Sequence, residues 1–115
     1  MTTVRLHRWD EIALEKITEM SSRKIVSGSS VMVAQTYLKR GALVPLHAHE
    51  SEQLSYVLQG ALRVVVGVDE FVVREGEVLR IPAGEAHHAE ALEDTLELDI
   101  FSPVRRDWVE AIEAD

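Results

Sequence analysis

From about residue 30 to residue 101, this sequence is a series of short apolar runs separated by glycine, proline and other turn-forming residues. Some runs alternate apolar and polar side chains and others are continuously apolar, as in half-buried and fully buried strands. They recur about every ten residues, the spacing typical of an all-β sandwich or barrel. The predicted strands span residues 31–38, 53–59, 62–66, 70–74, 78–81, 86–91 and 95–101.

The two ends of the chain are less regular. Residues 10–20 fit a short helix, whereas residues 17–27 fit an edge strand, and we favour the strand. After the turn at Ser102-Pro103, residues 106–112 predict a short closing helix. We therefore expect an all-β domain with a short C-terminal helix.

Composition narrows the class of protein. The chain has 115 residues, which fits one domain, and it contains no cysteine, which excludes disulfides and thiolate ligands. Its formal net charge of −8 opposes binding to phosphate backbones. No uncharged apolar run approaches the ~18 residues needed to span a bilayer, and no signal-peptide pattern is visible. We expect a cytoplasmic protein that binds neither nucleic acid nor membrane.

Three histidines suggest a metal site. His47 and His49 are two residues apart, so on an extended strand both imidazoles would lie on one face and reach one ion. A third, His87, follows two glycines and a proline. Three imidazoles with one oxygen donor and an open position are the makeup of a catalytic metal site. A pair of nearby histidines alone is more often a surface or core feature, so the spacing around them decides.

The spacing forms two complete patterns, Gly41-x5-His47-x-His49-x3-Gln53-x6-Gly60 and Gly76-x5-Pro82-x-Gly84-x2-His87. With these patterns the chain closely resembles a small single-domain cupin, over about residues 30–101. The resemblance implies a single cupin domain over residues 1–115, folded as a double-stranded β-helix, or jelly-roll barrel. It also implies one divalent metal ion inside the barrel, held by His47, His49, Gln53 and His87. Zinc, nickel, manganese and iron all remain open.

Two positions depart from the usual cupin pattern. Gln53 stands where the family usually has a glutamate, and Ala91 where it has an asparagine. An amide oxygen leaves the ion its full positive charge, which favours a Lewis-acid role. The alternative is that Gln53 only forms hydrogen bonds in the lumen and the metal has three protein ligands, since amides are weaker ligands than carboxylates. His88 should point away from His87 and not bind the metal.

The run at residues 95–101 alternates cleanly. Its aliphatic side chains take one face, and Glu97, Asp99 and Phe101 take the other. In a barrel one of these faces lines the lumen. A buried Asp99 would need a partner, and Arg105, just beyond the turn, is the candidate. The alternative is that such a pair is only structural, because ion pairs often have no catalytic role.

The run DIFSPVRRDW at residues 99–108 resembles the C-terminal signature of KdgF-type cupins. That family acts in pectin and alginate breakdown, converting 4,5-unsaturated uronates to linear keto forms. The resemblance implies that Asp99, Phe101 and Arg105 are catalytic, and that the partner is a small anionic sugar. Asp99 would move protons, Arg105 would bind the substrate carboxylate through a bidentate fork, and Phe101 would pack on the sugar ring.

Two other function classes remain open at this stage. Three-histidine cupin sites can also activate oxygen, as in Fe(II) dioxygenases, and a cupin can bind a small acid without catalysis. We also expect a homodimer, because cupins of this size are commonly dimers and an N-terminal edge strand would suit exchange between subunits.

Overall fold

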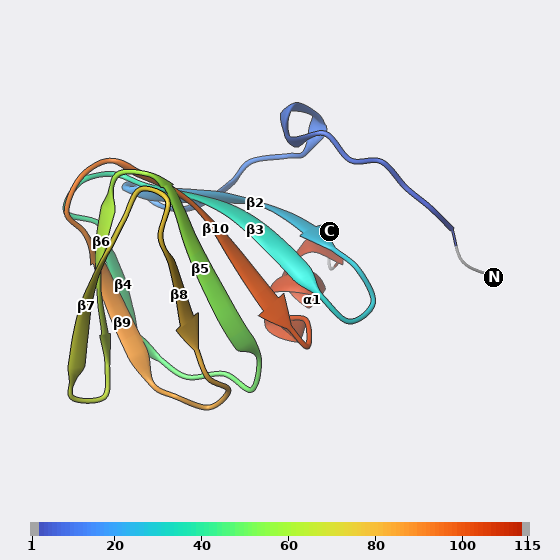
Figure 1. The fold of residues 1–115 in the computed structure, drawn as a ribbon. Coiled ribbons are helices and arrows are strands. Elements are labelled where there is room, and N and C mark those ends of the chain that lie inside the picture. Colours follow the sequence, from blue (N-terminus) through green and yellow to red (C-terminus); the bar gives the residue numbers. More distant parts are fainter. Residues whose placement is uncertain (1–2, 114–115) are drawn as a thin grey trace.

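The computed structural model describes residues 3–113. Its strands form two antiparallel sheets that face each other (Figure 1). The six-stranded sheet has the order β1-β2-β3-β10-β5-β8 and the four-stranded sheet has the order β4-β9-β6-β7. This arrangement confirms the predicted jelly-roll barrel. The strands are β1 (Glu15–Thr18), β2 (Ser21–Ser27), β3 (Met32–Leu38), β4 (Leu43–His47), β5 (Glu52–Gln59), β6 (Ala61–Val66), β7 (Asp69–Arg74), β8 (Val78–Ile81), β9 (His87–Ala91) and β10 (Thr95–Ser102).

The ends resolve the choice that the sequence left open. The N-terminal arm reaches away from the barrel and carries only a 3-10 turn, Trp9–Glu11 (Figure 1). The favoured edge strand is present, but it is a hairpin of β1 and β2 rather than one continuous strand. The closing helix α1 (Arg106–Glu113) is confirmed. No helix within residues 3–113 is long and apolar enough to cross a membrane. The expected homodimer stays a prediction.

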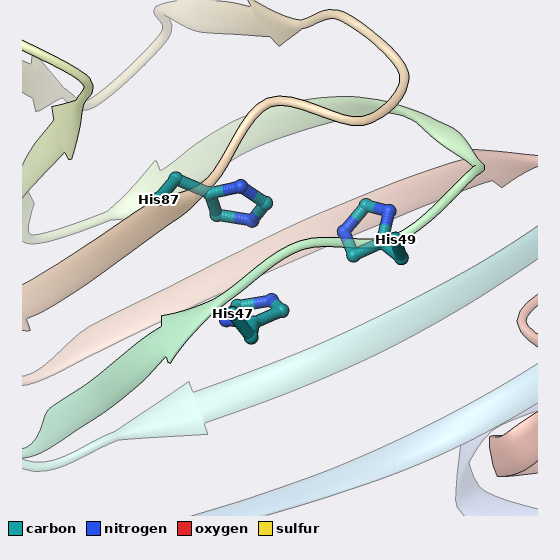
Figure 2. Close-up of side chains that lie close together, drawn as sticks. All are labelled: His47, His49 and His87. Carbon is teal, nitrogen blue, oxygen red and sulfur yellow. The ribbon is translucent and has the colours of Figure 1, made fainter.

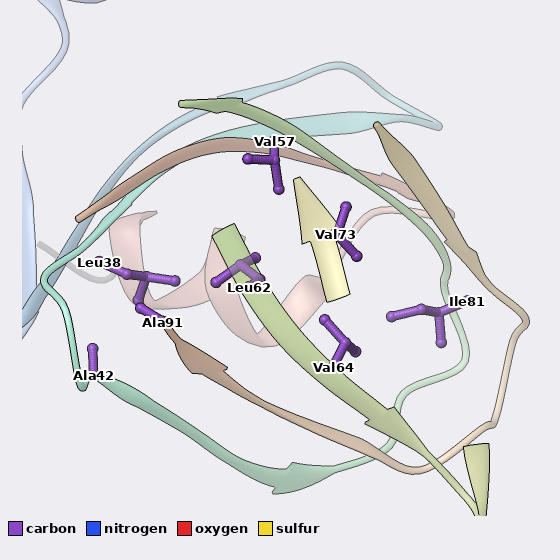
Figure 3. Packing of buried hydrophobic residues seen from close by; sticks show 8 residues of the cluster. All are labelled: Leu38, Ala42, Val57, Leu62, Val64, Val73, Ile81 and Ala91. Atoms are coloured by element: carbon purple, nitrogen blue, oxygen red, sulfur yellow. The ribbon is translucent and has the colours of Figure 1, made fainter. Parts of the chain in front are cut away.

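One apolar cluster fills part of the barrel between the sheets (Figure 3). Its members come from both sheets and the loops that join them, and they are Leu38, Ala42, Val57, Leu62, Val64, Val73, Ile81 and Ala91. Because strands alternate their side chains, β3 and β5 bury every second residue. Replacing one of the leucine or isoleucine side chains of this cluster with alanine would lower the free energy of unfolding by about 2–5 kcal/mol.

A second, smaller cluster seats helix α1 against the barrel. Phe101 and Met32 lie on paired positions of β10 and β3, and each is 1% exposed. Trp108 and Val109 of α1 pack against them. The helix therefore covers the barrel beside the last residues of β10.

Gly60, the closing glycine of the first histidine pattern, is required by close packing. Its φ of 96° lies in the left-handed region that L side chains rarely adopt. A Cβ on Gly60 would also collide with the carbonyl oxygen of Asp94 and with Thr95. The tight turn between β5 and β6 therefore leaves no room for a side chain.

Candidate functional site

The three histidines converge on one point of the lumen (Figure 2). His47 is the last residue of β4, His87 is the first residue of β9, and the two are paired across the four-stranded sheet. His49 lies in the loop that follows β4. One ring nitrogen from each histidine lies within 4.8 Å of the others.

Backbone carbonyls fix the orientation of all three rings. The Nδ1 atoms of His47, His49 and His87 lie 2.8, 2.9 and 2.8 Å from the carbonyl oxygens of Pro45, Ser51 and Glu85. A carbonyl oxygen only accepts, so each Nδ1 carries the hydrogen and each Nε2 keeps a free lone pair. This is the arrangement that prepares an imidazole to bind a metal through Nε2.

The surroundings keep two of these imidazoles neutral. Burial lowers the pKa of His49, and the positive charge of Arg105 acts in the same direction. Burial also lowers the pKa of His87. The Nε2 atom of His87 is fully enclosed and has no hydrogen-bond partner among the described residues. A buried acceptor without a partner is costly, and a metal ion would satisfy it.

Gln53 faces the histidines from the opposite wall. It lies on β5 in the six-stranded sheet and is 8% exposed. Its Nε2 donates to Ser55 Oγ at 2.9 Å, which turns its Oε1 toward His49 Nε2 at 3.0 Å. Two ligands at right angles around an ion, each about 2.1 Å away, would be about 3 Å apart. The four side chains therefore fit one divalent metal ion.

Two loops hold this cluster together. Ser51 Oγ donates to the carbonyl of Pro103 at 2.6 Å, which ties the His49 loop to the end of β10. The backbone N–H of Gly84 donates to the carbonyl of His49 at 2.8 Å, which ties the same loop to the segment before His87. The positions of the imidazoles thus depend on contacts between distant parts of the chain.

A cavity of about 370 Å³ adjoins the histidines. Its polar lining comes from strands of both sheets and from the segment after β10. That lining includes His47, His87, Gln53, Ser55, Thr36, Glu97, Asp99 and Arg105. Such a volume is in the range of small-molecule sites.

Two carboxyl groups lie side by side in this cavity. Asp99 accepts hydrogen bonds from Ser55 Oγ at 2.8 Å and from Thr36 Oγ1 and Gln53 Nε2 at 3.4 Å. Burial raises the pKa of Asp99, while hydrogen bonds from Glu97, Ser55 and Thr36 act against that rise. Burial, and then the neighbouring charge of Asp99, raise the pKa of Glu97 well above its ordinary value. The pair therefore favours a charged Asp99 beside a neutral Glu97.

The comparisons with known proteins agree with this geometry. The family model described as Cupin domain matches residues 35–102. The chain belongs to the cupin family.

Solved structures extend the comparison to most of this cupin. KdgF from Halomonas sp. is 34% identical, with 86% of this chain and 94% of that chain covered and a TM-score of 0.80. An RmlC-like cupin from Shewanella frigidimarina is 25% identical, with 92% and 96% covered and a TM-score of 0.85. A predicted oxalate decarboxylase from Thermotoga maritima, at 21% identity, 87% and 100% coverage and a TM-score of 0.76, shares the fold. None of the curated proteins matches the sequence.

The sequence offered Arg105 as the partner of Asp99, but in this cupin the two side chains do not form an ion pair. The Nε and Nη2 atoms of Arg105 donate to the carboxylate of Asp107 at 3.3 and 3.0 Å. Asp107 is only two residues away in the chain and takes the place expected for Asp99. The Nη1 atom of Arg105 is fully enclosed and has no partner in the part of the chain that the structure describes. Arg105 thus keeps one unpaired donor group beside the cavity that it lines.

The structure also shows where the other residues considered for the site lie. Phe101 faces the lumen, 5.5 Å from the His49 ring centroid to centroid. His88 follows His87 on β9 and pairs with Val65 of β6, and it is not in the metal cluster. The extended strand expected for both His47 and His49 ends at His47, so His49 lies in the loop beyond it. Gln53 belongs to the other sheet.

Sequence reasoning missed two contributors. Glu97 was placed on the face of Asp99 by alternation, but no role followed from that. Arg23 on β2 lies 3.7 Å from the centroid of the Trp108 ring, and Arg105 lies 4.3 Å from the same centroid. Arg23 also binds Glu15 at 2.7 Å, so the N-terminal hairpin and helix α1 meet beside the cavity. No local pattern in the sequence signals that contact.

Proposed function

We propose that this cupin is a metal-dependent enzyme that converts a 4,5-unsaturated uronate, derived from pectin or alginate, to its linear keto form. The observation that carries the proposal is the enclosed Nη1 of Arg105, which has no partner among the described residues and lies in the cavity that Asp99, His47 and His87 also line. A buried cationic donor without a partner suits an anionic ligand. The 34% identity to KdgF from Halomonas sp. supports the same reading.

Arg105 is the proposed anchor for the substrate carboxylate. Its Nε and Nη2 atoms are occupied by Asp107, so the bidentate fork expected from sequence is already used. The free Nη1 would donate to the substrate instead. Asp107 holds the guanidinium in place, and the side chain of Arg105 is only 10% exposed, so little rotamer freedom is lost on binding.

The proposed metal ligands are the three Nε2 atoms and the Gln53 oxygen. When bound there, a divalent ion would supply Lewis-acid stabilisation of negative charge on a substrate oxygen. The chain itself prepares the site through the backbone contacts that orient each ring. The hydrogen bond from Gln53 to Ser55 orients the amide.

Asp99 is the proposed proton-transfer group. Opening the cyclic hemiacetal removes the proton of the anomeric hydroxyl and breaks the bond between C1 and the ring oxygen. The anomeric oxygen becomes the carbonyl of a C1 aldehyde, the electron pair of the broken bond leaves an enolate at C4 and C5, and a proton added to C4 gives the C5 ketone. The Asp99 carboxylate would take the first proton and return one to C4, so no proton is consumed overall. Phe101 forms a flat apolar wall on which the ring can rest.

The test is the ultraviolet absorbance of an unsaturated uronate, because ring opening destroys the conjugated alkene. Metal-loaded protein should accelerate the loss of absorbance above the spontaneous rate. No acceleration with either galacturonate-derived or alginate-derived substrate would reject the proposal. Oxygen consumption that depends on added Fe(II) would favour the dioxygenase alternative instead.

A further inference from the structure

Glu97 is a buried carboxyl group that the proposed reaction does not use. It is 5% exposed and lines the cavity. On β10 it is the lumen-facing residue before Asp99, and lumen-facing positions are about 7 Å apart along a strand. Along β10 the order is therefore Phe101 beside Arg105, then Asp99, then Glu97.

The hydrogen bonding of Glu97 is incomplete. Its Oε2 is fully enclosed and has no partner among residues 3–113. Its carboxyl interacts with that of Asp99, and a hydrogen bond between two carboxyl groups uses a proton on one of them. Asp99 already accepts from Ser55 and Thr36, which suits the charged partner. A carboxyl oxygen keeps a lone pair whether or not the group is protonated, so Oε2 of Glu97 has acceptor capacity that the described protein does not fill.

We propose that Glu97 is a specificity-determining residue, whose free carboxyl oxygen accepts a hydrogen bond from a ring hydroxyl of the unsaturated uronate. This inference rests on the proposed function. In such a sugar the carboxylate is attached to C5, and the hydroxyls on C2 and C3 lie on the far side of the ring. With the carboxylate at Arg105 and the ring beside Phe101 and Asp99, those hydroxyls extend toward Glu97.

The chemistry of the neighbourhood selects a neutral donor. An anionic group would be repelled by the adjacent Asp99 carboxylate. Across the strands, Glu97 is paired with Thr36 and Val57, so no cation of the protein competes for its free oxygen at those positions. A site that holds a hydroxyl with a buried acceptor rejects an analogue without it, since the acceptor is then left unpaired.

The experiment compares three proteins on three substrates. The proteins are wild type, Glu97→Gln and Glu97→Leu, and the substrates are the unsaturated uronate and its analogues without the C2 or the C3 hydroxyl. The glutamine side chain keeps an oxygen that can accept a hydrogen bond and an N–H that can donate to Asp99. The leucine side chain keeps only a similar size and removes both hydrogen-bonding groups. We expect kcat/KM of Glu97→Leu to fall at least about tenfold on the full substrate, and Glu97→Gln to stay within about threefold of wild type.

The analogues decide between recognition and general damage. If Glu97 binds a hydroxyl, wild type loses at least about tenfold on one analogue, and the penalty of Glu97→Leu disappears on that analogue. An equal penalty on all three substrates would overturn the inference and leave the proposed function standing. If Glu97→Leu does not fold, undiminished wild-type activity on both analogues overturns the inference by itself. Wild type that turns over none of the substrates would remove the proposed function, and the inference with it.

Discussion

The side-chain oxygen of Gln53 lies 3.0 Å from Nε2 of His49, although neither atom has a hydrogen to share. The His49 hydrogen is on Nδ1, which donates to Ser51, and the lowered pKa disfavours a second proton. Reversing the amide would turn its oxygen toward Asp99, an acceptor 3.4 Å away. Two lone pairs that face each other at this distance are stabilised by a cation between them.

Purified protein should therefore carry one divalent transition metal ion per chain. The double variant His47→Ala, His49→Ala should lose it, because half of the proposed ligands are gone. Removal of the ion with a chelator should also lower the melting temperature, since an ion that binds only the folded state stabilises it. Elemental analysis and thermal unfolding measure both effects.

His88→Ala is the matched control, because His88 neighbours His87 but is not in the metal cluster. It should keep the metal content of wild type. Full metal occupancy in the double variant would refute the assignment.

Gln53→Glu should keep the metal but reduce turnover. A carboxylate would lower the net charge of the metal centre and weaken its Lewis acidity. It would also replace the amide donor that points toward Asp99 with a like charge. We expect kcat to fall about tenfold or more at unchanged metal content. Turnover equal to that of wild type would show that the charge at this position is unimportant.

The two faces of β10 could be predicted from sequence because a strand has a strict period of two, but the sequence left open which face lines the lumen. Residues 95–101 alternate without a bulge on the side of β3, so Glu97, Asp99 and Phe101 share one face as expected, and the structure buries that face. The partners of Asp99 could not be predicted in the same way. Ser55 and Thr36 reach it only because β10 lies between β5 and β3, and this strand order is a property of the whole barrel.

Gln53 lies beside His49 in the lumen, as the cupin resemblance implied. Local alternation does not account for this position, because the chain crosses from one sheet to the other between His47 and Gln53. The two walls of the barrel, rather than local alternation, bring the ligands together.

Asp99→Asn should lower kcat by roughly a hundredfold or more, the usual range for losing a positioned acid or base. The fold should survive, because an asparagine oxygen can still accept from Ser55 and Thr36. Steady-state kinetics, with metal content and melting temperature measured on the same samples, separate lost chemistry from lost structure. A kcat within about threefold of wild type would exclude Asp99 as the proton-transfer group.

Arg105→Ala should mainly raise KM, if the contact with the substrate carboxylate is equally strong in the ground and transition states. Some stability should also be lost, because the guanidinium packs 4.3 Å from the Trp108 centroid. Arg106→Ala is the matched control: it removes the same charge from an exposed neighbour. Equal changes in KM for the two variants would indicate a general electrostatic effect instead of a specific anchor.

The buried carboxyl of Glu97 should make the stability of the folded protein depend on pH. Its pKa is raised well above the ordinary value of 4.5, first by burial and then by Asp99. A carboxyl with a higher pKa in the folded state contributes its full stability below pH 4.5, and that contribution is lost as the pH rises toward the folded pKa. Glu97→Gln is neutral at every pH and escapes this loss. From pH 5 to pH 8, the free energy of unfolding of the metal-free wild type should therefore fall relative to Glu97→Gln, by up to about 1.4 kcal/mol per pH unit. Urea unfolding at each pH measures the difference.

The control is Glu93→Gln, which changes an exposed glutamate and should follow wild type at every pH. A constant difference between wild type and Glu97→Gln would show that Glu97 is not held neutral in the folded protein.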